Sequence, residues 1–214
     1  MPPSETPRGG RPRNPEIDAA VLDATLALLD EVGYNHLSIE EVGRRAGTTK
    51  PAVYRRWPNR QRLVLAALTR QLGELPVPDT GCTLCDLGEG VLVYVTAFQR
   101  MPPDVLGPLL ADCAADADLR AAFMSTLFLP PRAAVRTLLE RARERGDLRA
   151  DLDLELTLDL LGSLVHYRAL FGHAQVTEAE VEQAIETVLR GAATDYPALV
   201  EHSLALEAAH HLHG

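Results

Sequence analysis

Residues 38–60 read SIEEVGRRAGTTKPAVYRRWPNR, and the spacing of their capping and turn residues predicts two short helices joined by a tight turn. Ser38 followed by Glu41 is a capping box, in which the hydroxyl accepts a backbone N–H bond and the carboxylate reaches back to the helix start. This helix must end at Gly47, because glycine readily adopts the left-handed conformation found just past helix ends. Thr49 can cap the second helix. The arrangement is typical of a helix-turn-helix, whose second helix enters the major groove of DNA.

The second helix of this pair is predicted to have an inner and an outer face. With about 100° between successive residues, Val53 and Trp57 lie together and are expected to pack against the preceding helices. Pro51, Ala52 and Arg55 point away from them, toward the groove. The starts of helices add unpaired N–H groups that favour a phosphate. The residues predicted to contact DNA are Ser38, Thr49, Lys50, Pro51, Ala52, Tyr54, Arg55, Arg56, Asn59 and Arg60.

Charge is divided unevenly along the chain. The net charge of −9 by itself disfavours a nucleic-acid partner, because phosphate repels acidic proteins on average. Residues 1–70 nevertheless hold 11 Lys and Arg against 8 Asp and Glu, whereas residues 71–214 hold 10 against 22. Within residues 38–62, seven basic residues stand against two acidic ones. The basic stretch therefore coincides with the predicted helix-turn-helix, as phosphate binding requires.

The rest of the chain is expected to be helical, since no alternating strand pattern competes. Asn14 and Pro15 start a helix that ends near Gly33, and Asn59 starts another that ends at about Leu72. Further helices are expected at 82–100, 104–114, 118–145 with a bend at Pro130 and Pro131, 153–171 and 177–190, with a weakly signalled one at 197–209. The predicted fold is all-α, ordered as a disordered basic arm (1–14), a helix-turn-helix domain (15–72), a connection (73–81), a second helical domain (82–191) and a tail with a possible short helix (192–214).

Residues 38–60 resemble the N-terminal signature of the TetR family of bacterial regulators, and the resemblance extends over about residues 15–68. It implies base contacts near Lys50, Pro51 and Ala52, and groove or phosphate contacts from Tyr54, Arg55, Arg56 and Arg60. It also implies a homodimer that binds a pseudo-palindromic operator in double-stranded DNA and leaves it when a small-molecule ligand enters the second domain. Residues 141–153 look like a stretch common in one subgroup of the family. Gly43 stands where alanine is usual and is expected to loosen its helix.

The second helical domain has more apolar residues than one buried stripe needs. The surplus lies on the helices expected at 153–171 and 177–190, at Leu154, Leu158, Leu161, Val165, Val181, Ile185, Val188 and Leu189. It indicates a four-helix interface between subunits, with burial inside one subunit as the alternative. A ligand pocket is predicted among Tyr94, Phe98, Met101, Cys113, Phe123, Met124, Leu127, His166, Tyr167 and Arg168, although such residues more often fill a core.

Other classes of protein are disfavoured by what the chain lacks. Cys82 and Cys85 have C-x-x-C spacing, but no second pair of ligands accompanies them, so we expect reduced structural thiols, no metal and no cofactor. Charges interrupt every apolar run before the ~18 residues of a membrane span, and the first 14 residues lack a signal peptide's apolar centre, so we expect a cytoplasmic protein without membrane contact. The alternatives are a small-molecule-binding helical protein or enzyme with an incidental basic hairpin, or nonspecific DNA packaging. No nucleophile–base constellation supports the first, and the acidic bulk disfavours the second.

Overall fold

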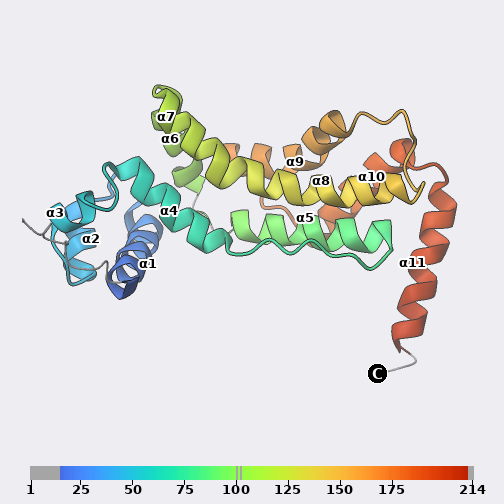
Figure 1. Cartoon of the computed structure of the whole chain (residues 1–214), viewed down its shortest axis with the longest axis horizontal. Coiled ribbons are helices and arrows are strands. Elements are labelled where there is room, and N and C mark those ends of the chain that lie inside the picture. The colour runs from blue at the N-terminus through green and yellow to red at the C-terminus, as the bar shows by residue number, and fades with distance from the viewer. Residues whose placement is uncertain (1–14, 100, 102, 212–214) are drawn as a thin grey trace, which may run out of the picture.

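The structure, a computed structural model that describes residues 15–99, 101 and 103–211, is built of α-helices, and the predicted all-α fold is confirmed (Figure 1). No strand occurs within these ranges, where Leu148 and Ala193 form only an isolated bridge. None of the helices described has the length and apolar character needed to span a membrane. The disordered arm expected at 1–14 lies outside the described residues.

The N-terminal end of the molecule consists of four helices, and the three caps predicted from the sequence are present. The helices are α1 (Pro15–Val32), α2 (Ile39–Arg45), α3 (Lys50–Tyr54) and α4 (Arg60–Leu72). Ser38 Oγ accepts a hydrogen bond from the Glu41 amide, and Thr49 Oγ1 accepts one from the Ala52 amide, both at 3.4 Å. Asn59 Oδ1 accepts one from the Arg62 amide at 2.8 Å. Local sequence signals therefore determine where α2, α3 and α4 begin.

Glycines shape the turn between α2 and α3. Gly47 has a φ of +63°, the left-handed conformation that the sequence predicted. Gly43 lies where the turn packs onto α2: a Cβ there would be 3.2 Å from the carbonyl oxygen of Thr48, whose amide donates to the Gly43 carbonyl at 2.8 Å. The missing side chain of Gly43 permits this close approach of the turn, while the looser α2 expected from the glycine stays a prediction.

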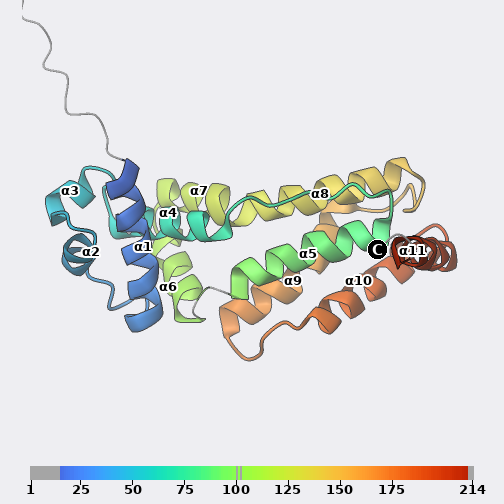
Figure 2. The ribbon, with the colours of Figure 1, turned by 90° about the horizontal axis from the view of Figure 1, so that it is seen from below.

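The remaining helices form a bundle that extends away from α1–α4 (Figures 1 and 2). They are α5 (Thr83–Gln99), α6 (Pro103–Ala114), α7 (Ala117–Phe123), the π-helical turn η1 (Met124–Phe128), α8 (Leu129–Glu144), α9 (Leu154–Phe171), α10 (Glu178–Ala192) and α11 (Tyr196–His211). Helix α5 packs against α8, α9 and α10, and α4 packs against α5, α6, α7 and η1. The tail predicted at 192–214 thus contains a helix of 16 residues, at the end of the bundle far from α3.

The single bent helix predicted over 118–145 is instead three consecutive segments. The first begins at Ala117, because Asp116 caps it by accepting from the Leu119 amide at 2.9 Å. The backbone then widens into η1, where the Leu129 amide donates to the Met124 carbonyl, five residues earlier. Pro130 and Pro131 have no N–H to continue the α-helical pattern back toward this turn, which explains why the register changes just before them.

The cysteines differ from expectation. Cys82 and Cys85 are joined in a disulfide, with 5.3 Å between their Cα atoms, so the expectation of reduced thiols is wrong for this pair. The reason is local: Cys82 directly precedes α5 and Cys85 lies in its first turn, and residues three apart share a helix face. Cys113 is a free thiol and buried, as a core cysteine is expected to be. Within the described ranges no cluster of His, Cys, Asp and Glu has the arrangement of a metal site.

Candidate DNA-binding surface and ligand cavities

Helix α3 is anchored from behind by apolar side chains. Val53 is buried in one cluster with Ile39 and Val42 of α2, and the partly buried Trp57 packs against this cluster. The predicted inner face of the helix is therefore present. A rigidly held α3 is what groove recognition requires, since a base contact needs a side chain in a fixed position.

The outer side of α3 presents cations without acidic partners. Lys50, Pro51 and Arg55 are exposed, and Tyr54 is 40% exposed. Within the described part of the chain, the side chains of Lys50, Tyr54 and Arg55 have no hydrogen-bond or ion-pair partner. Lys50 and Tyr54 on this short helix, and Arg55 directly after it, are therefore available to phosphates and base edges.

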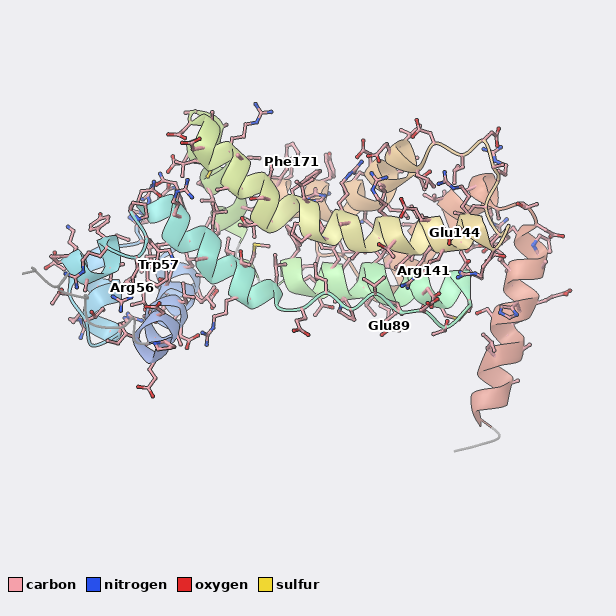
Figure 3. All side chains as sticks on the ribbon, viewed as in Figure 1. Arg56, Trp57, Glu89, Arg141, Glu144 and Phe171 are labelled. Atoms are coloured by element: carbon pink, nitrogen blue, oxygen red, sulfur yellow. A yellow bond between two sulfur atoms is a disulfide. The ribbon has the colours of Figure 1, made fainter. Side chains whose placement is uncertain are left out.

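Arg56 has a partner outside α3, and Ala52 is buried; the groove or phosphate contact predicted for Arg56 stays a prediction. Arg56 pairs with the Asp18 carboxylate of α1 and donates to the Ala52 carbonyl at 3.2 Å. Its guanidinium is thus held against α1, at the end of the molecule where Figure 3 labels Arg56. Ala52 is only 7% exposed, so its predicted place on the outer face is wrong. The cause is tertiary: α1 supplies a carboxylate beside α3, which the spacing within α3 alone does not reveal.

Arg60 lies in a contact between the helix-turn-helix and α6. Its guanidinium carbon lies 4.3 Å from the centre of the Tyr34 ring, and its Nη2 is 3.0 Å from Asp112 Oδ2. The same carboxylate oxygen accepts from the Tyr34 hydroxyl at 2.7 Å and from Gln61 at 3.0 Å. We call Tyr34, Arg60, Gln61 and Asp112 the α6 contact. In this structure Arg60 joins the two domains, and the phosphate contact predicted for it stays a prediction.

The α6 contact makes stability depend on pH. Hydrogen bonds from Tyr34, Arg60 and Gln61 lower the pKa of Asp112 below its ordinary value of 3.8. A carboxyl whose pKa is lower in the folded state stabilises that state above its unfolded pKa, and loses this contribution as pH falls through the folded pKa. We expect Asp112→Asn to lower the melting temperature at pH 7 and the difference from wild type to shrink below about pH 4. Thermal melts between pH 3 and pH 7 measure this, and a constant difference over that range would contradict it.

Two basic residues of α2, Arg44 and Arg45, are neutralised locally. Arg44 pairs with Glu41 at 2.5 Å, and Arg45 pairs with Glu31 at 2.6 Å and with Glu41 at 2.9 Å. The two guanidinium groups lower the pKa of Glu41 to about 2, so this carboxylate stays charged at neutral pH. The basic residues of 38–62 without an ion pair in the described part of the chain are therefore Lys50 of α3, Arg55 directly after it and Arg62 of α4.

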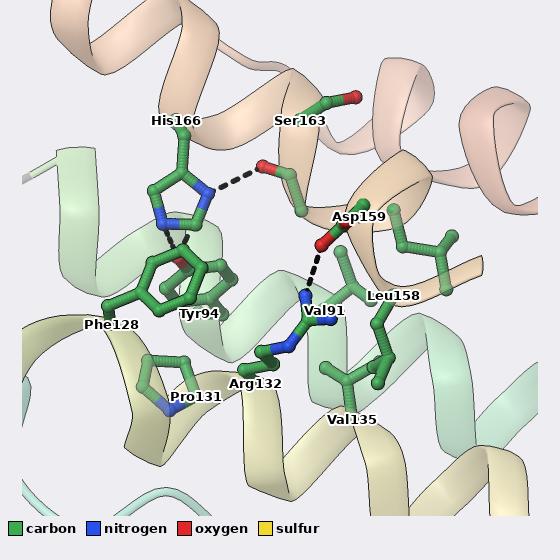
Figure 4. A pocket seen from close by; sticks show the side chains of 12 residues that line it. Val91, Tyr94, Phe128, Pro131, Arg132, Val135, Leu158, Asp159, Ser163 and His166 are labelled. Atoms are coloured by element: carbon green, nitrogen blue, oxygen red, sulfur yellow. Dashed lines mark hydrogen bonds and ion pairs between the residues drawn. The ribbon is translucent and has the colours of Figure 1, made fainter. Parts of the chain in front are cut away.

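The second domain contains two neighbouring cavities that share Phe128 and His166. The first, of about 220 Å³, is lined by Val91, Tyr94, Phe128, Pro131, Arg132, Val135, Leu158, Asp159, Leu161, Gly162, Ser163 and His166 (Figure 4). The second, of about 230 Å³, is lined by Phe98, Leu106, Leu110, Phe123, Met124, Leu127, Phe128, His166 and Leu170. Of the predicted pocket residues, Tyr94, Phe98, Phe123, Met124, Leu127 and His166 line one of them.

Four predicted pocket residues lie elsewhere. Met101 and Arg168 line a separate opening between the ends of α5 and α9, and Arg168 forms an ion pair with Glu180 at 2.7 Å. Tyr167 is 57% exposed, and Cys113 is buried without lining any of the cavities described here. The type of a residue indicates whether its side chain suits a buried position. Which cavity the side chain lines depends on the helix face that carries it.

His166 is the polar centre of the two cavities. Its Nδ1 lies 2.8 Å from the Gly162 carbonyl oxygen, and the Tyr94 hydroxyl lies 2.5 Å from its Nε2. Burial lowers the pKa of His166, so the ring is neutral at pH 7, with Nδ1–H donating to Gly162 and Nε2 accepting from Tyr94. Its ring also lies 5.3 Å from that of Phe128 and 5.5 Å from that of Phe98.

Several lining residues were missed from the sequence. Phe128 is the last residue of η1, Arg132 follows the two prolines in the first turn of α8, and Asp159 is one turn before Ser163 on α9. Arg132 is held by Glu155 at 2.7 Å and Asp159 at 2.5 Å. The one available signal was the Pro130-Pro131 pair itself, since breaks in a helix often mark functional sites.

A helix-turn-helix whose recognition helix carries unpaired cations, joined to an all-helical second domain, defines a DNA-binding transcriptional regulator. Residues 21–67 match the family described as "Bacterial regulatory proteins, tetR family", and residues 77–188 match "Tetracyclin repressor-like, C-terminal domain". The chain belongs to the TetR family, as the sequence resemblance implied.

Relatives and solved structures agree with this assignment. The chain is 30% identical to the HTH-type transcriptional regulator AqdR of Rhodococcus erythropolis, over 80% of this chain and 83% of that protein. It is 28% identical to the DNA-binding transcriptional repressor TetR of Mycobacteroides abscessus, over 80% of this chain and 90% of that protein. The crystal structure of the TetR family transcription regulator SCO0332 superposes with a TM-score of 0.64 and 31% identity, covering 82% of this chain and 98% of that one.

Proposed function

We propose that this regulator is a repressor that binds a pseudo-palindromic operator as a homodimer and leaves it when a small molecule enters the cavities beside His166. The observation that carries the proposal is the position of η1. Its Leu127 and Phe128 line the cavities, and η1 packs against α4, the last helix of the DNA-binding domain. A ligand that moves η1 therefore acts on α4 through direct contact. The Mycobacteroides relative is named a repressor, which supports the direction of the effect.

A change at α4 would alter the distance between the two recognition helices of a dimer. Helix α4 follows α3 after only a short turn, and its first residue, Arg60, belongs to the α6 contact. Two half-sites lie a fixed number of helical turns apart on DNA, so both recognition helices fit only at one spacing. A ligand can bind more tightly to the protein with α4 in a different position than to the DNA-bound form. The ratio of these two ligand affinities sets how far the ligand can lower the affinity of the protein for DNA.

The proposed dimer surface is an exposed apolar stripe on α9. Leu156, Leu160, Tyr167 and Phe171 lie on one face of this helix and are between 54% and 70% exposed. Leu160 and Tyr167 line a groove together with Val188 of α10, so both helices contribute. The apolar residues on which the sequence prediction rested, such as Leu158 and Ile185, are buried within the subunit instead. An exposed stripe of this kind marks an interaction site, and a two-fold axis would pair it with its own copy.

The proposal assigns the chain no catalytic step and places it in the cytoplasm with its operator. The function is tested by a gel-shift assay with the DNA that flanks its own gene. We expect sequence-specific binding that weakens steeply with salt, because the protein displaces counterions from the phosphates it contacts. Unrelated DNA of the same length is the control. Equal affinity for both DNAs would contradict the proposal and favour nonspecific packaging.

A further inference from the structure

The lining of the two cavities limits the chemistry of a ligand more sharply than the family does. The second cavity is lined by apolar side chains apart from His166. In the first cavity Arg132 is the only lysine or arginine, and its guanidinium is already held by Glu155 and Asp159. Asp159 itself lines the first cavity, so an anionic ligand would meet a carboxylate beside the cation (Figure 4). A charged ligand would lose its hydration without gaining an unpaired partner.

The hydrogen-bonded pair of Tyr94 and His166 has one acceptor site that is not used. His166 uses Nδ1–H on the Gly162 carbonyl and Nε2 on the Tyr94 hydroxyl. Tyr94 therefore uses its only proton, but its oxygen keeps a lone pair that can accept. A ligand group that reaches this point forms a good bond only if it donates. A hydroxyl does so, whereas an ether or a ketone places acceptor against acceptor.

We propose that the cavities take an uncharged, mainly apolar ring compound whose single hydroxyl donates to the Tyr94 oxygen, with its rings against Phe128 and Phe98. The role of this ligand as an effector rests on the proposed function, but its binding does not. A cavity of about 220 Å³ accommodates a fused two-ring compound, and the second cavity leaves room for an apolar extension.

Three naphthalenes of similar size test the proposal by calorimetric titration of the DNA-free protein at pH 7. 1-Naphthol has the hydroxyl, 1-methylnaphthalene replaces it with a methyl group, and 1-naphthoate carries a negative charge. We expect 1-naphthol to bind about three- to tenfold more tightly than 1-methylnaphthalene, the contribution of one neutral hydrogen bond. We expect 1-naphthoate to bind at least about tenfold more weakly than 1-naphthol. Equal affinities, a preference for naphthoate, or no binding of any of the three would overturn the proposal.

A double variant locates the hydroxyl. Tyr94→Phe with His166→Phe removes both acceptors and keeps the cavity apolar, so 1-naphthol should lose its advantage while 1-methylnaphthalene still binds. The matched control is Tyr196→Phe with His202→Phe, a tyrosine and a histidine of α11 that line neither cavity. An unchanged preference in the first double variant would overturn the proposal. The ranking in wild-type protein tests it even if that variant does not fold, and failure of the gel-shift assay would contradict the proposed function without changing this ranking.

Discussion

Arg55→Ala is expected to weaken binding of the dimer to its operator by about 30-fold to about 10⁴-fold. Arg55 directly follows α3, is exposed and has no side-chain partner within the described residues, so its guanidinium is available to a base edge. A side chain that contacts a base by two hydrogen bonds contributes about 1–3 kcal/mol of discrimination. A homodimer carries the substitution in both half-sites, which doubles the loss, and each 1.4 kcal/mol corresponds to about tenfold in affinity. Fluorescence anisotropy with a labelled operator measures the change.

The control for Arg55→Ala is Arg149→Ala, which removes the same charge at the far end of the bundle. Arg149 is about half exposed and pairs only loosely with Asp151, at 3.8 Å. We expect it to leave operator affinity within about twofold, because exposed ion pairs contribute little and the site is distant from DNA. Sedimentation should show an unchanged oligomeric state for both variants. Undiminished operator affinity in Arg55→Ala and in Tyr54→Ala would mean that α3 does not read the groove as proposed.

Leu160→Glu is expected to convert the proposed dimer to a monomer at micromolar concentration. Leu160 is 54% exposed in the single chain and lies in the middle of the α9 stripe. In a two-fold interface the substitution would bury a carboxylate from each subunit without a partner, which costs several kcal/mol per charge. A rise in the dimer dissociation constant of at least about 100-fold follows. Sedimentation velocity over a concentration series measures it.

The matched control for this variant is Leu204→Glu, an equally exposed leucine on α11. It introduces the same charge outside the stripe and should leave the dimer intact. The monomeric Leu160→Glu protein should also bind the operator more weakly than wild type, because each half-site is then bound separately. A Leu160→Glu protein that remains dimeric would place the interface on a different surface.

The DNA-binding domain could be predicted from sequence because its determinants are local. Ser38, Thr49 and Asn59 each accept a hydrogen bond from an amide three residues later, and Gly47 supplies the turn. Such signals depend on a few neighbouring residues, so one sequence is enough to locate α2, α3 and α4. The inner side of α3 followed from helical periodicity in the same way, with Val53 buried as expected.

The partners of individual side chains could not be predicted because they come from distant parts of the chain. The carboxylate that holds Arg56 is 38 residues away, and the one that holds Arg60 is 52 residues away. The proposed dimer stripe could not be located from sequence either. Helix α9 has apolar residues on several faces, so its sequence alone does not show that Leu158 is buried and Leu160 exposed. The cavities depend on η1, where the helix becomes π-helical just before Pro130 and Pro131. The two prolines predict a bend in the helix, but they do not predict this wider turn.

The central claim is that α3 reads specific bases in two symmetric half-sites. Selection of bound sequences from a pool of random duplexes tests it most directly, with wild-type protein and Arg55→Ala run in parallel. We predict that wild type enriches an inverted repeat and that Arg55→Ala loses the preference at the same position of both half-sites. A wild-type selection without an inverted repeat, or the same motif enriched equally by both proteins, would contradict the claim.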